Sequence, residues 1–389
     1  MALPSWFASQ GFSAADIAFF VFITALPWSF KLFAGPLMDR FSYPAMGRRR
    51  PWVLVAQLGI ALAFLSLTLA PDPKSYFYVT AFLGFMVNFF ASTQDVAVDG
   101  MAIDVLPPED RARANAFMFG GQLLGISLGS SGGGYALNLF GLSGVALLGA
   151  GATALIFLVP LFVREREGEK LLPWTSGQAS QHALNMQVEK LLPLLKSAMG
   201  AIFSPASLLL ILTVSLAKLA DGLVSTMLPV YTVQELGWAD VRYNDWYAAG
   251  GIISAFVGLA VSPLFDRFGA GKAITAIVVC KVAIVLFLVM AALIGSGQAI
   301  QNFIILNYIT MHLFTIVAIA TMMSICTSQV AASQFAVYMA LMNLMFANGS
   351  LVYAALQTSF DANGLFLWAA LLSGALLIPW WYVNKRYLS

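Results

Sequence analysis

The sequence predicts an all-α membrane protein, and its composition and the spacing of its apolar residues carry that prediction. Of the 389 residues, 60% are hydrophobic and 10% are charged, whereas soluble domains carry about 25% charged residues. The apolar residues gather in runs of roughly 20, the helix length that crosses a bilayer core about 30 Å thick. A soluble enzyme is therefore excluded, and we expect the chain not to be an enzyme.

Eleven such runs follow one another, and each is expected to be one transmembrane helix. They span residues 14–37, 52–70, 76–103, 113–140, 143–163, 206–230, 243–265, 272–294, 299–326, 333–358 and 362–383. Most connections are short and rich in Pro, Gly and Asp, but the connection 164–205 is long. We therefore expect an N-terminal transmembrane half of five helices over 1–163, a central cytoplasmic loop over 164–205 and a C-terminal half of six helices over 206–389.

The positions of Lys and Arg predict the orientation of these helices. Most of the 20 basic residues lie in alternate connections, at 40–50, 111–113, 164–196, 267–272 and 385–386, while the opposite connections hold only Lys74 and Arg242. Short cytoplasmic loops retain positive charge, so we expect the C-terminus in the cytoplasm and the N-terminus of this chain in the periplasm. The net charge is only +2, and the basic residues are scattered rather than massed on one face, which argues against a nucleic-acid partner. Cys280 and Cys326 have no paired spacing, so no metal site is expected.

An internal repeat relates the two halves. The segment 36–41, Pro-Leu-Met-Asp-Arg-Phe, recurs at 263–268 as Pro-Leu-Phe-Asp-Arg-Phe, and the halves stay in register back to residue 3. The second half contains a helix over 206–227 ahead of this register, and nothing in the chain matches that helix. We therefore expect a twelve-helix design in two halves, with a first helix missing from this chain.

Several motifs resemble those of known transporters. Residues 35–40 and 47–50 are similar to the loop motif between the second and third helices of the major facilitator superfamily. Residues 94–99 (Gln-Asp-Val-Ala-Val-Asp), 103–107, 218–221 (Lys-Leu-Ala-Asp) and 332–336 resemble the AmpG-type muropeptide permeases, which are related to acetyl-CoA transporters. The resemblance implies a major facilitator fold and proton-coupled import of muropeptides or N-acetylglucosaminyl-anhydromuramyl sugars across the cell inner membrane for cell-wall recycling.

Composition and charge placement by themselves indicate only a secondary transporter with buried titratable groups. One alternative is a carrier of another anionic metabolite, such as an acyl-CoA or a glycoconjugate. Another is a non-transporting membrane receptor or an inactive fragment. For a transporter, the expected partners are a small-molecule substrate and the lipid bilayer, the expected state is a monomer, and no cofactor is expected, with the proton gradient as the driving force.

Charged residues inside the predicted helices are the candidate transport site, because such residues cost several kcal/mol unless they are paired or face water. Asp95 and Asp99, next to Gln94, lie four residues apart and share one helix face. Carboxylates this close suit proton uptake and release, although they could instead be salt-bridged to hold helices together. Lys31 is expected at a depth similar to that of Asp95, so these two residues could pair.

Three more charged residues lie in the predicted helices of the C-terminal half. Lys218 and Asp221 are three residues apart near the expected midplane, where transport sites of this architecture lie. They either contact substrate or form a self-neutralising pair that packs the helix. Lys281 has no acidic residue nearby in sequence, so we expect it to extend to the cytoplasmic interface.

The repeated Asp-Arg pairs predict a cytoplasmic gate. Asp39 and Arg40, and in the second half Asp266 and Arg267, are expected at helix ends facing the cytoplasm. Each Asp can hold a neighbouring helix N-terminus and each Arg can pair with an acid across the gap, forming a latch that breaks on inward opening. The basic run 48–50 is expected to be an interfacial anchor, and the glycines at 121, 125, 129 and 133 a close-packing stripe.

Overall fold

The computed structural model describes residues 2–70, 72–185, 200, 202–293, 297–326 and 331–385, and within these ranges the chain is helical with no β-strand. It divides into two compact units. Unit 1 comprises Met1–Phe22, Gly120–Tyr135 and Ala198–Ser389, and unit 2 comprises Ile23–Phe119 and Ala136–Ser197. This division into contact units does not test the expected boundary between the two transmembrane halves at 164–205, which stays a prediction.

The first part of the chain forms a series of α-helices and two short 3₁₀ turns. They are α1 (Ala2–Ser9), α2 (Ala14–Ala25), the 3₁₀ turn η1 (Leu26–Phe30), α3 (Lys31–Arg40), η2 (Pro44–Met46), α4 (Arg50–Leu67), α5 (Phe77–Val105), α6 (Pro108–Phe162) and α7 (Gln181–Asn185). Pro27 lies in η1, where the missing N–H interrupts the α-helical hydrogen bonds between α2 and α3. Lys31 is therefore the first residue of a new helix.

The second part consists of longer helices. They are α9 (Pro205–Val230), the π-helical turn η3 (Tyr231–Glu235), α10 (Asp240–Phe268), α11 (Ala270–Leu293), α12 (Gly297–Ser324), α13 (Ala331–Leu356), α14 (Ala362–Ala375) and α15 (Leu377–Val383). Ser204 caps α9 by accepting a hydrogen bond from the backbone N–H of Ser207. Asp361 caps α14 in the same way through the N–H of Gly364, so both helices begin where a short polar side chain satisfies a free N–H group.

The described helices account for the predicted spans. Nine segments are long and apolar enough to cross a membrane. One of them, Gly120–Phe162, has 43 residues, which is about 65 Å of helix and twice the thickness of a bilayer core. Gly141 interrupts it with a φ of 65°, between the predicted helices 113–140 and 143–163. We count that segment as two helices and add α10, which covers the predicted helix 243–265. The described chain then contains all eleven predicted transmembrane helices.

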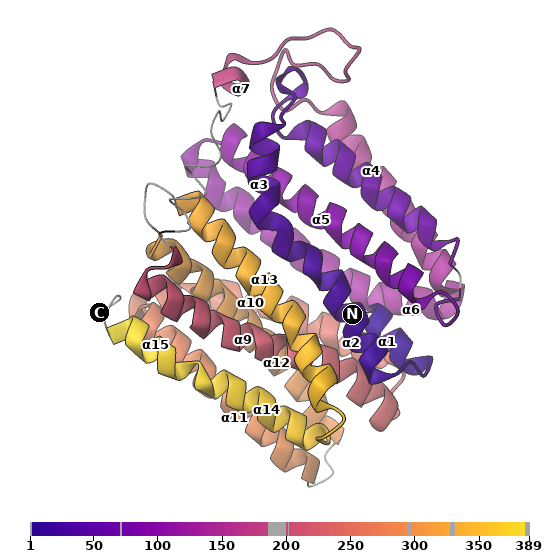
Figure 1. Cartoon of the computed structure of the whole chain (residues 1–389), viewed down its shortest axis with the longest axis vertical. Helices are drawn as coiled ribbons and strands as arrows, with labels where there is room; N and C mark the ends of the chain where they lie inside the picture. Colours follow the sequence, from indigo (N-terminus) through magenta and orange to yellow (C-terminus); the bar gives the residue numbers. More distant parts are fainter. Residues whose placement is uncertain are drawn as a thin grey trace. The chain divides into compact units, whose positions relative to one another are not determined.

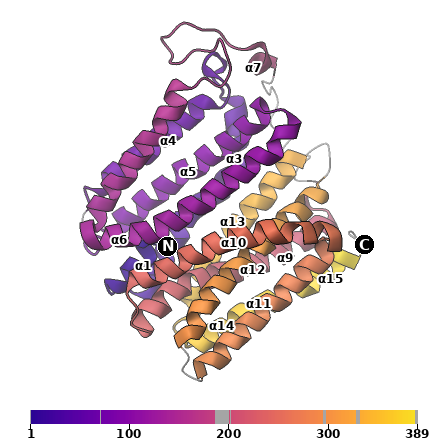
Figure 2. The same ribbon diagram turned by 180° about the vertical axis from the view of Figure 1, so that it is seen from behind.

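Unit 2 is held together by α3, α4 and α5, which lie side by side in both ribbon views (Figures 1 and 2). Met38 of α3, Val53 of α4 and Ala97 of α5 form a buried apolar core between them. Contact among these three helices places Lys31, Asp39, Asp95 and Asp104 in one packed unit. The charged residues of α3 and α5 can therefore meet.

Unit 1 has a larger core formed by α9, α11, α12, α13 and α15. Its closest helix crossing joins α9 to α13 at two glycines. A Cβ atom on Gly222 would lie 2.0 Å from the carbonyl oxygen of Phe346, and one on Gly349 would lie 2.5 Å from that of Leu219. The two backbones are thus in direct contact beside Asp221, and only glycine fits at either position.

The predicted close-packing stripe in α6 is largely wrong. Apart from the adjacent residues and the nearby backbone of α6 itself, no atom of the described residues lies within 4 Å of a Cβ built on Gly121, Gly125 or Gly129. Gly133 alone of the four has a neighbour, the Cβ of Ala2 at 3.3 Å. Four-residue spacing shows that small residues share a helix face, but it does not show whether another helix covers that face.

Polar contacts join α1 and the middle of α6 to α10 within unit 1. The hydroxyl of Ser5 donates to Oδ1 of Asn244 at 3.0 Å. The Asp245 carboxylate accepts from the hydroxyl groups of Ser131 at 2.5 Å and Tyr135 at 2.8 Å. The sequence analysis did not single out Asp245, because its partners lie more than 100 residues earlier and have no motif.

Candidate transport and gating sites

The first site, here called the acidic cluster, consists of Lys31, Asp95 and Asp99 in unit 2. Lys31 and Asp95 form an ion pair, with 16% and 30% of their side chains exposed. The Lys31 ammonium also lies 4.7 Å from the centre of the Trp28 ring. The indole of Trp28 donates to Oδ1 of Asn88 at 2.9 Å, which fixes the ring beneath the cation. The sequence indicated that Lys31 and Asp95 could pair, and the structure confirms that contact.

Asp99 lies one turn beyond Asp95 on α5 and is exposed. No described residue forms a hydrogen bond or ion pair with it. Because Lys31 neutralises Asp95, the carboxylate of Asp99 is the surplus negative charge of the acidic cluster. Gln94, the other polar residue of this stretch, is half-buried. An accessible carboxylate without a cation partner can take up and release a proton without first breaking an ion pair.

The second site, here called the basic cluster, consists of Lys218, Asp221 and Lys281 in unit 1. Asp221 is 1% exposed, and its two carboxylate oxygens bind different lysines. Oδ2 lies 3.3 Å from Nζ of Lys218, and Oδ1 pairs with Lys281. Lys218 and Lys281 are only 9% and 7% exposed, so the whole cluster is buried. Nζ of Lys218 also donates to the hydroxyl of Thr315 on α12 at 2.7 Å.

The expected placement of Lys281 at the cytoplasmic interface is wrong. Its ammonium lies inside unit 1 on Asp221, a residue of another helix 60 positions earlier. The search for a partner along α11 missed it because the nearest acid is close only in the folded chain. The predicted pairing of Lys218 with Asp221 is present, but these residues do not neutralise each other alone, because Lys281 shares the same carboxylate.

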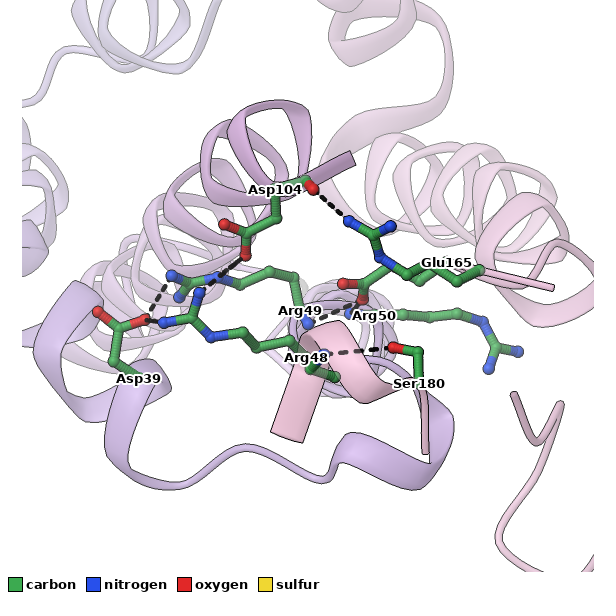
Figure 3. A network of polar contacts seen from close by, with 9 residues as sticks. Asp39, Arg48, Arg49, Arg50, Asp104, Glu165 and Ser180 are labelled. Atoms are coloured by element: carbon green, nitrogen blue, oxygen red, sulfur yellow. Dashed lines mark hydrogen bonds and ion pairs between the residues drawn. The ribbon is translucent and has the colours of Figure 1, made fainter. Parts of the chain in front are cut away.

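The third site, here called the arginine network, joins the ends of three helices (Figure 3). Asp39 and Asp104 lie in the last turns of α3 and α5, and Arg48 and Arg49 precede α4. Arg48 lies 2.7 Å from Oδ1 of Asp39 and 3.1 Å from Oδ2 of Asp104. Arg49 pairs with the same two carboxylates. Two cations therefore bridge two anions, and each helix end is tied to the next.

The network corrects two expectations about the gate. Arg48 and Arg49 are buried ion-pair partners of Asp39 rather than interfacial anchors. Arg40, the expected pairing residue, is exposed, and no described residue pairs with it. In the second half, Arg267 lies over the ring of Phe268 at 5.8 Å, whereas the side chain of Asp266 lies outside the described residues. The adjacent arginines, not the Arg of the repeated pair, thus hold Asp39.

Arg50 has a separate role, and its side chain is 1% exposed. Nε donates to the carbonyl oxygen of Pro160 at 2.6 Å, and Nη2 donates to those of Leu161 and Leu171 at 3.0 and 2.7 Å. Nη1 donates to the carbonyl oxygen of Lys170 at 3.2 Å. Two of these acceptors belong to the last turn of α6, where carbonyl groups lack helical partners. Arg50 is therefore a buried cap of α6, and its expected role as an anchor is wrong.

Glu165 makes the reciprocal cap on α4 (Figure 3). One of its carboxylate oxygens accepts from the backbone N–H groups of Arg49 and Arg50, both at 2.8 Å. A carboxylate at a helix N-terminus is favoured by the free N–H groups and the helix dipole. The close approach requires glycine at position 47, where φ is 100° and a Cβ would lie 2.5 Å from the Glu165 oxygen.

The segment after α6 folds back around a buried glutamate. Glu169 is 1% exposed and accepts from the hydroxyl of Ser180 and the backbone N–H of Arg166, each at 3.0 Å. Burial raises the pKa of the Glu169 carboxyl above its usual value, against the opposing effect of these hydrogen bonds. The first part of the central loop is therefore an ordered structure packed on α4 and α6.

Comparison with known proteins identifies the family of this chain. Residues 1–355 match the Major Facilitator Superfamily. An anhydromuropeptide permease of Escherichia coli (strain K12) is 25% identical over 360 residues, which cover 87% of this chain and 66% of the permease. A relative from Rickettsia prowazekii (strain Madrid E) named AmpG 3 is 26% identical over 353 residues, covering 85% of this chain and 78% of that protein.

Solved structures with a similar fold include two transporters. The nucleoside transporter NupG matches with a TM-score of 0.67 and 11% identity over 99% of this chain and 96% of that chain. The human organic anion transporter MFSD10 matches with a TM-score of 0.62 and 16% identity over 95% of this chain and 83% of that chain. The fold and the matched residues agree: this chain is a membrane carrier rather than an enzyme, and it belongs to the Major Facilitator Superfamily.

Proposed function

We propose that this chain imports anhydromuropeptides together with protons, with Asp99 as the proton carrier and the Lys31–Asp95 pair beside it. The relatives named AmpG 3 and anhydromuropeptide permease support the substrate. The observation that supports the coupling is the exposed Asp99 carboxylate, which no described residue pairs with, one turn from a neutralised Asp95. A carboxyl group that alternates between protonated and ionised states links substrate movement to the proton gradient.

We further propose that the arginine network acts as the cytoplasmic gate, and we infer the orientation of the chain from the positions of its positive charges. Arg48 and Arg49 hold Asp39 and Asp104 together, and these ion pairs must separate if the ends of α3, α4 and α5 move apart. The excess of Lys and Arg supports a cytoplasmic C-terminus and a periplasmic N-terminus of this chain in the cell inner membrane. The carrier is proposed to act as a monomer that needs no cofactor.

The decisive experiment measures transport by the chain in proteoliposomes. An imposed pH gradient should drive accumulation of anhydromuropeptide, and Asp99→Asn should abolish this accumulation while preserving counterflow at zero gradient. A neutral amide resembles the protonated carboxyl that lets the loaded carrier reorient, but it cannot release a proton. Asp72→Asn, in the exposed connection between α4 and α5, is the matched control and should accumulate substrate normally.

Three outcomes would contradict the proposal. Gradient-driven accumulation by Asp99→Asn equal to that of the unchanged protein would exclude Asp99 as the carrier of the proton. Binding of anhydromuropeptide without flux would favour a membrane receptor. Transport of an acyl-CoA in place of anhydromuropeptide would support the alternative of another anionic metabolite.

A further inference from the structure

The basic cluster contains more positive charge than the described residues neutralise. Two ammonium groups share the single carboxylate of Asp221, and no second acidic residue of the described chain pairs with Lys218 or Lys281. All three side chains are at least nine-tenths buried. An uncompensated charge away from water is costly, so a surplus cation here calls for an anion from outside the cluster.

Counting hydrogen-bond donors leads to the same conclusion independently. Each ammonium has three N–H donors. Lys218 directs two of them to Asp221 and Thr315, and Lys281 directs one to Asp221. The Thr315 hydroxyl donates to the carbonyl oxygen of Met311 at 2.7 Å, so it is already oriented to accept from Lys218. Three ammonium donors thus have no acceptor among the described residues.

The cluster is also held in place by its backbone. Lys218 and Asp221 lie on α9, Lys281 on α11 and Thr315 on α12, so three helices of unit 1 converge on the same point. Gly222 follows Asp221 and is in backbone contact with α13. Asp221 therefore cannot move far with its helix, and the two lysines are held on either side of it. A preorganised pair of cations is the arrangement that binds an anion with two oxygens.

We propose that Lys218 and Lys281 form a binding subsite for a carboxylate group of the transported substrate, with Asp221 as the resident counter-ion between them. This inference rests on the proposed function, since anhydromuropeptides carry carboxylates in their peptide portion. The subsite would hold that carboxylate through the ammonium donors that Asp221 and Thr315 leave free. Lys281 is the best residue to test, because its removal leaves Lys218 and Asp221 as a neutral pair.

The first test uses a small probe and does not depend on the proposed substrate. Thermal unfolding of the purified chain is followed in sodium acetate, with sodium chloride at equal ionic strength and acetamide as the uncharged analogue. Acetate should raise the unfolding midpoint above both references, and Lys281→Met should lose this shift. Lys272→Met, which removes an exposed lysine of the same helix, is the matched control and should keep it.

The second test compares anhydromuropeptide with its carboxamide derivative in binding assays. The unchanged protein should bind the carboxylate form about tenfold more tightly, and Lys281→Met should bind both forms equally. An acetate shift of the same size in Lys281→Met and the unchanged protein would overturn the subsite. If anhydromuropeptide is not bound but the acetate shift still depends on Lys281, the result supports the subsite and contradicts the proposed substrate. If anhydromuropeptide is transported with no preference for its carboxylates, the proposed function stands and the subsite falls.

Discussion

The acidic cluster and the basic cluster both lie in membrane-spanning helices, but they differ in the sign of their surplus charge and in their exposure. The acidic cluster has two carboxylates for one ammonium; the Asp95 side chain is 30% exposed, and Asp99 is exposed. The basic cluster has two ammonium groups for one carboxylate, and none of the three exceeds 9% exposure. A charge that reaches water can exchange protons with it, whereas a buried charge depends on its partners. This difference is the basis on which we propose proton exchange at the acidic cluster and anion binding at the basic cluster.

The largest effect should come from removing the counter-ion of the basic cluster. Asp221→Asn leaves two buried ammonium groups without an anion and should lower the free energy of unfolding by about 3–5 kcal/mol. Lys281→Met added to Asp221→Asn should recover part of that loss, because only one buried cation remains. Equilibrium unfolding in mixed micelles measures both variants. Equal stability of the single and double variants would show that Lys281 carries no surplus charge in the folded protein.

The second prediction compares glycine-to-alanine substitutions in the backbone beside the two clusters. Gly222→Ala would press a methyl group against the carbonyl oxygen of Phe346 and should cost about 2–3 kcal/mol. Gly100→Ala, beside Asp99, would meet the side chain of Arg49 at 2.8 Å. That side chain can shift only against its ion pairs with Asp39 and Asp104, so the variant should cost about 1–2 kcal/mol. Unfolding of the two variants under identical conditions gives the difference. Similar losses would mean that the two clusters are equally rigid.

A smaller effect is expected from the counter-ion of the acidic cluster. Asp95→Asn leaves Lys31 partly exposed and still over the Trp28 ring, so the loss of stability should be only about 1 kcal/mol. Lys31→Met in the same background should restore expression to the unchanged level. A loss of stability as large as that of Asp221→Asn would show that the difference in burial between the clusters does not determine the cost of removing a counter-ion.

The smallest effect concerns a carboxyl group that is buried without a lysine partner. The pKa of Glu169 is raised in the folded protein by burial, so its contribution to stability is fully present below its unfolded pKa and is lost as the pH rises through its folded pKa. The stability of the unchanged protein relative to Glu169→Gln should therefore fall between acidic and neutral pH, by less than about 1 kcal/mol. Paired unfolding measurements at several pH values test this, and an opposite slope would contradict it.

The sequence predicted the transmembrane helices and the contact of Lys31 with Asp95, but it misplaced Lys281 and Arg50. Physical reasons explain each outcome. Apolar runs report directly on membrane spans, and depth along a helix sufficed to propose the contact of Lys31 with Asp95. Lys281 was misplaced because its acid lies on another helix. Arg50 was misjudged because its acceptors are backbone carbonyl groups, which every residue type carries and no motif marks.

The cap formed by Arg50 has a consequence for the order in which the chain folds during synthesis. The carbonyl groups that receive its guanidinium belong to residues 110–121 positions later, and ribosomes add about 5–20 residues per second. For several seconds or more, the Arg50 guanidinium thus lacks the carbonyl groups that bury it in the folded chain. Only when α6 and the start of the central loop have emerged can the same charge become buried. The cap on α6 therefore forms late, after both the helix that carries Arg50 and the helix that it caps have been made.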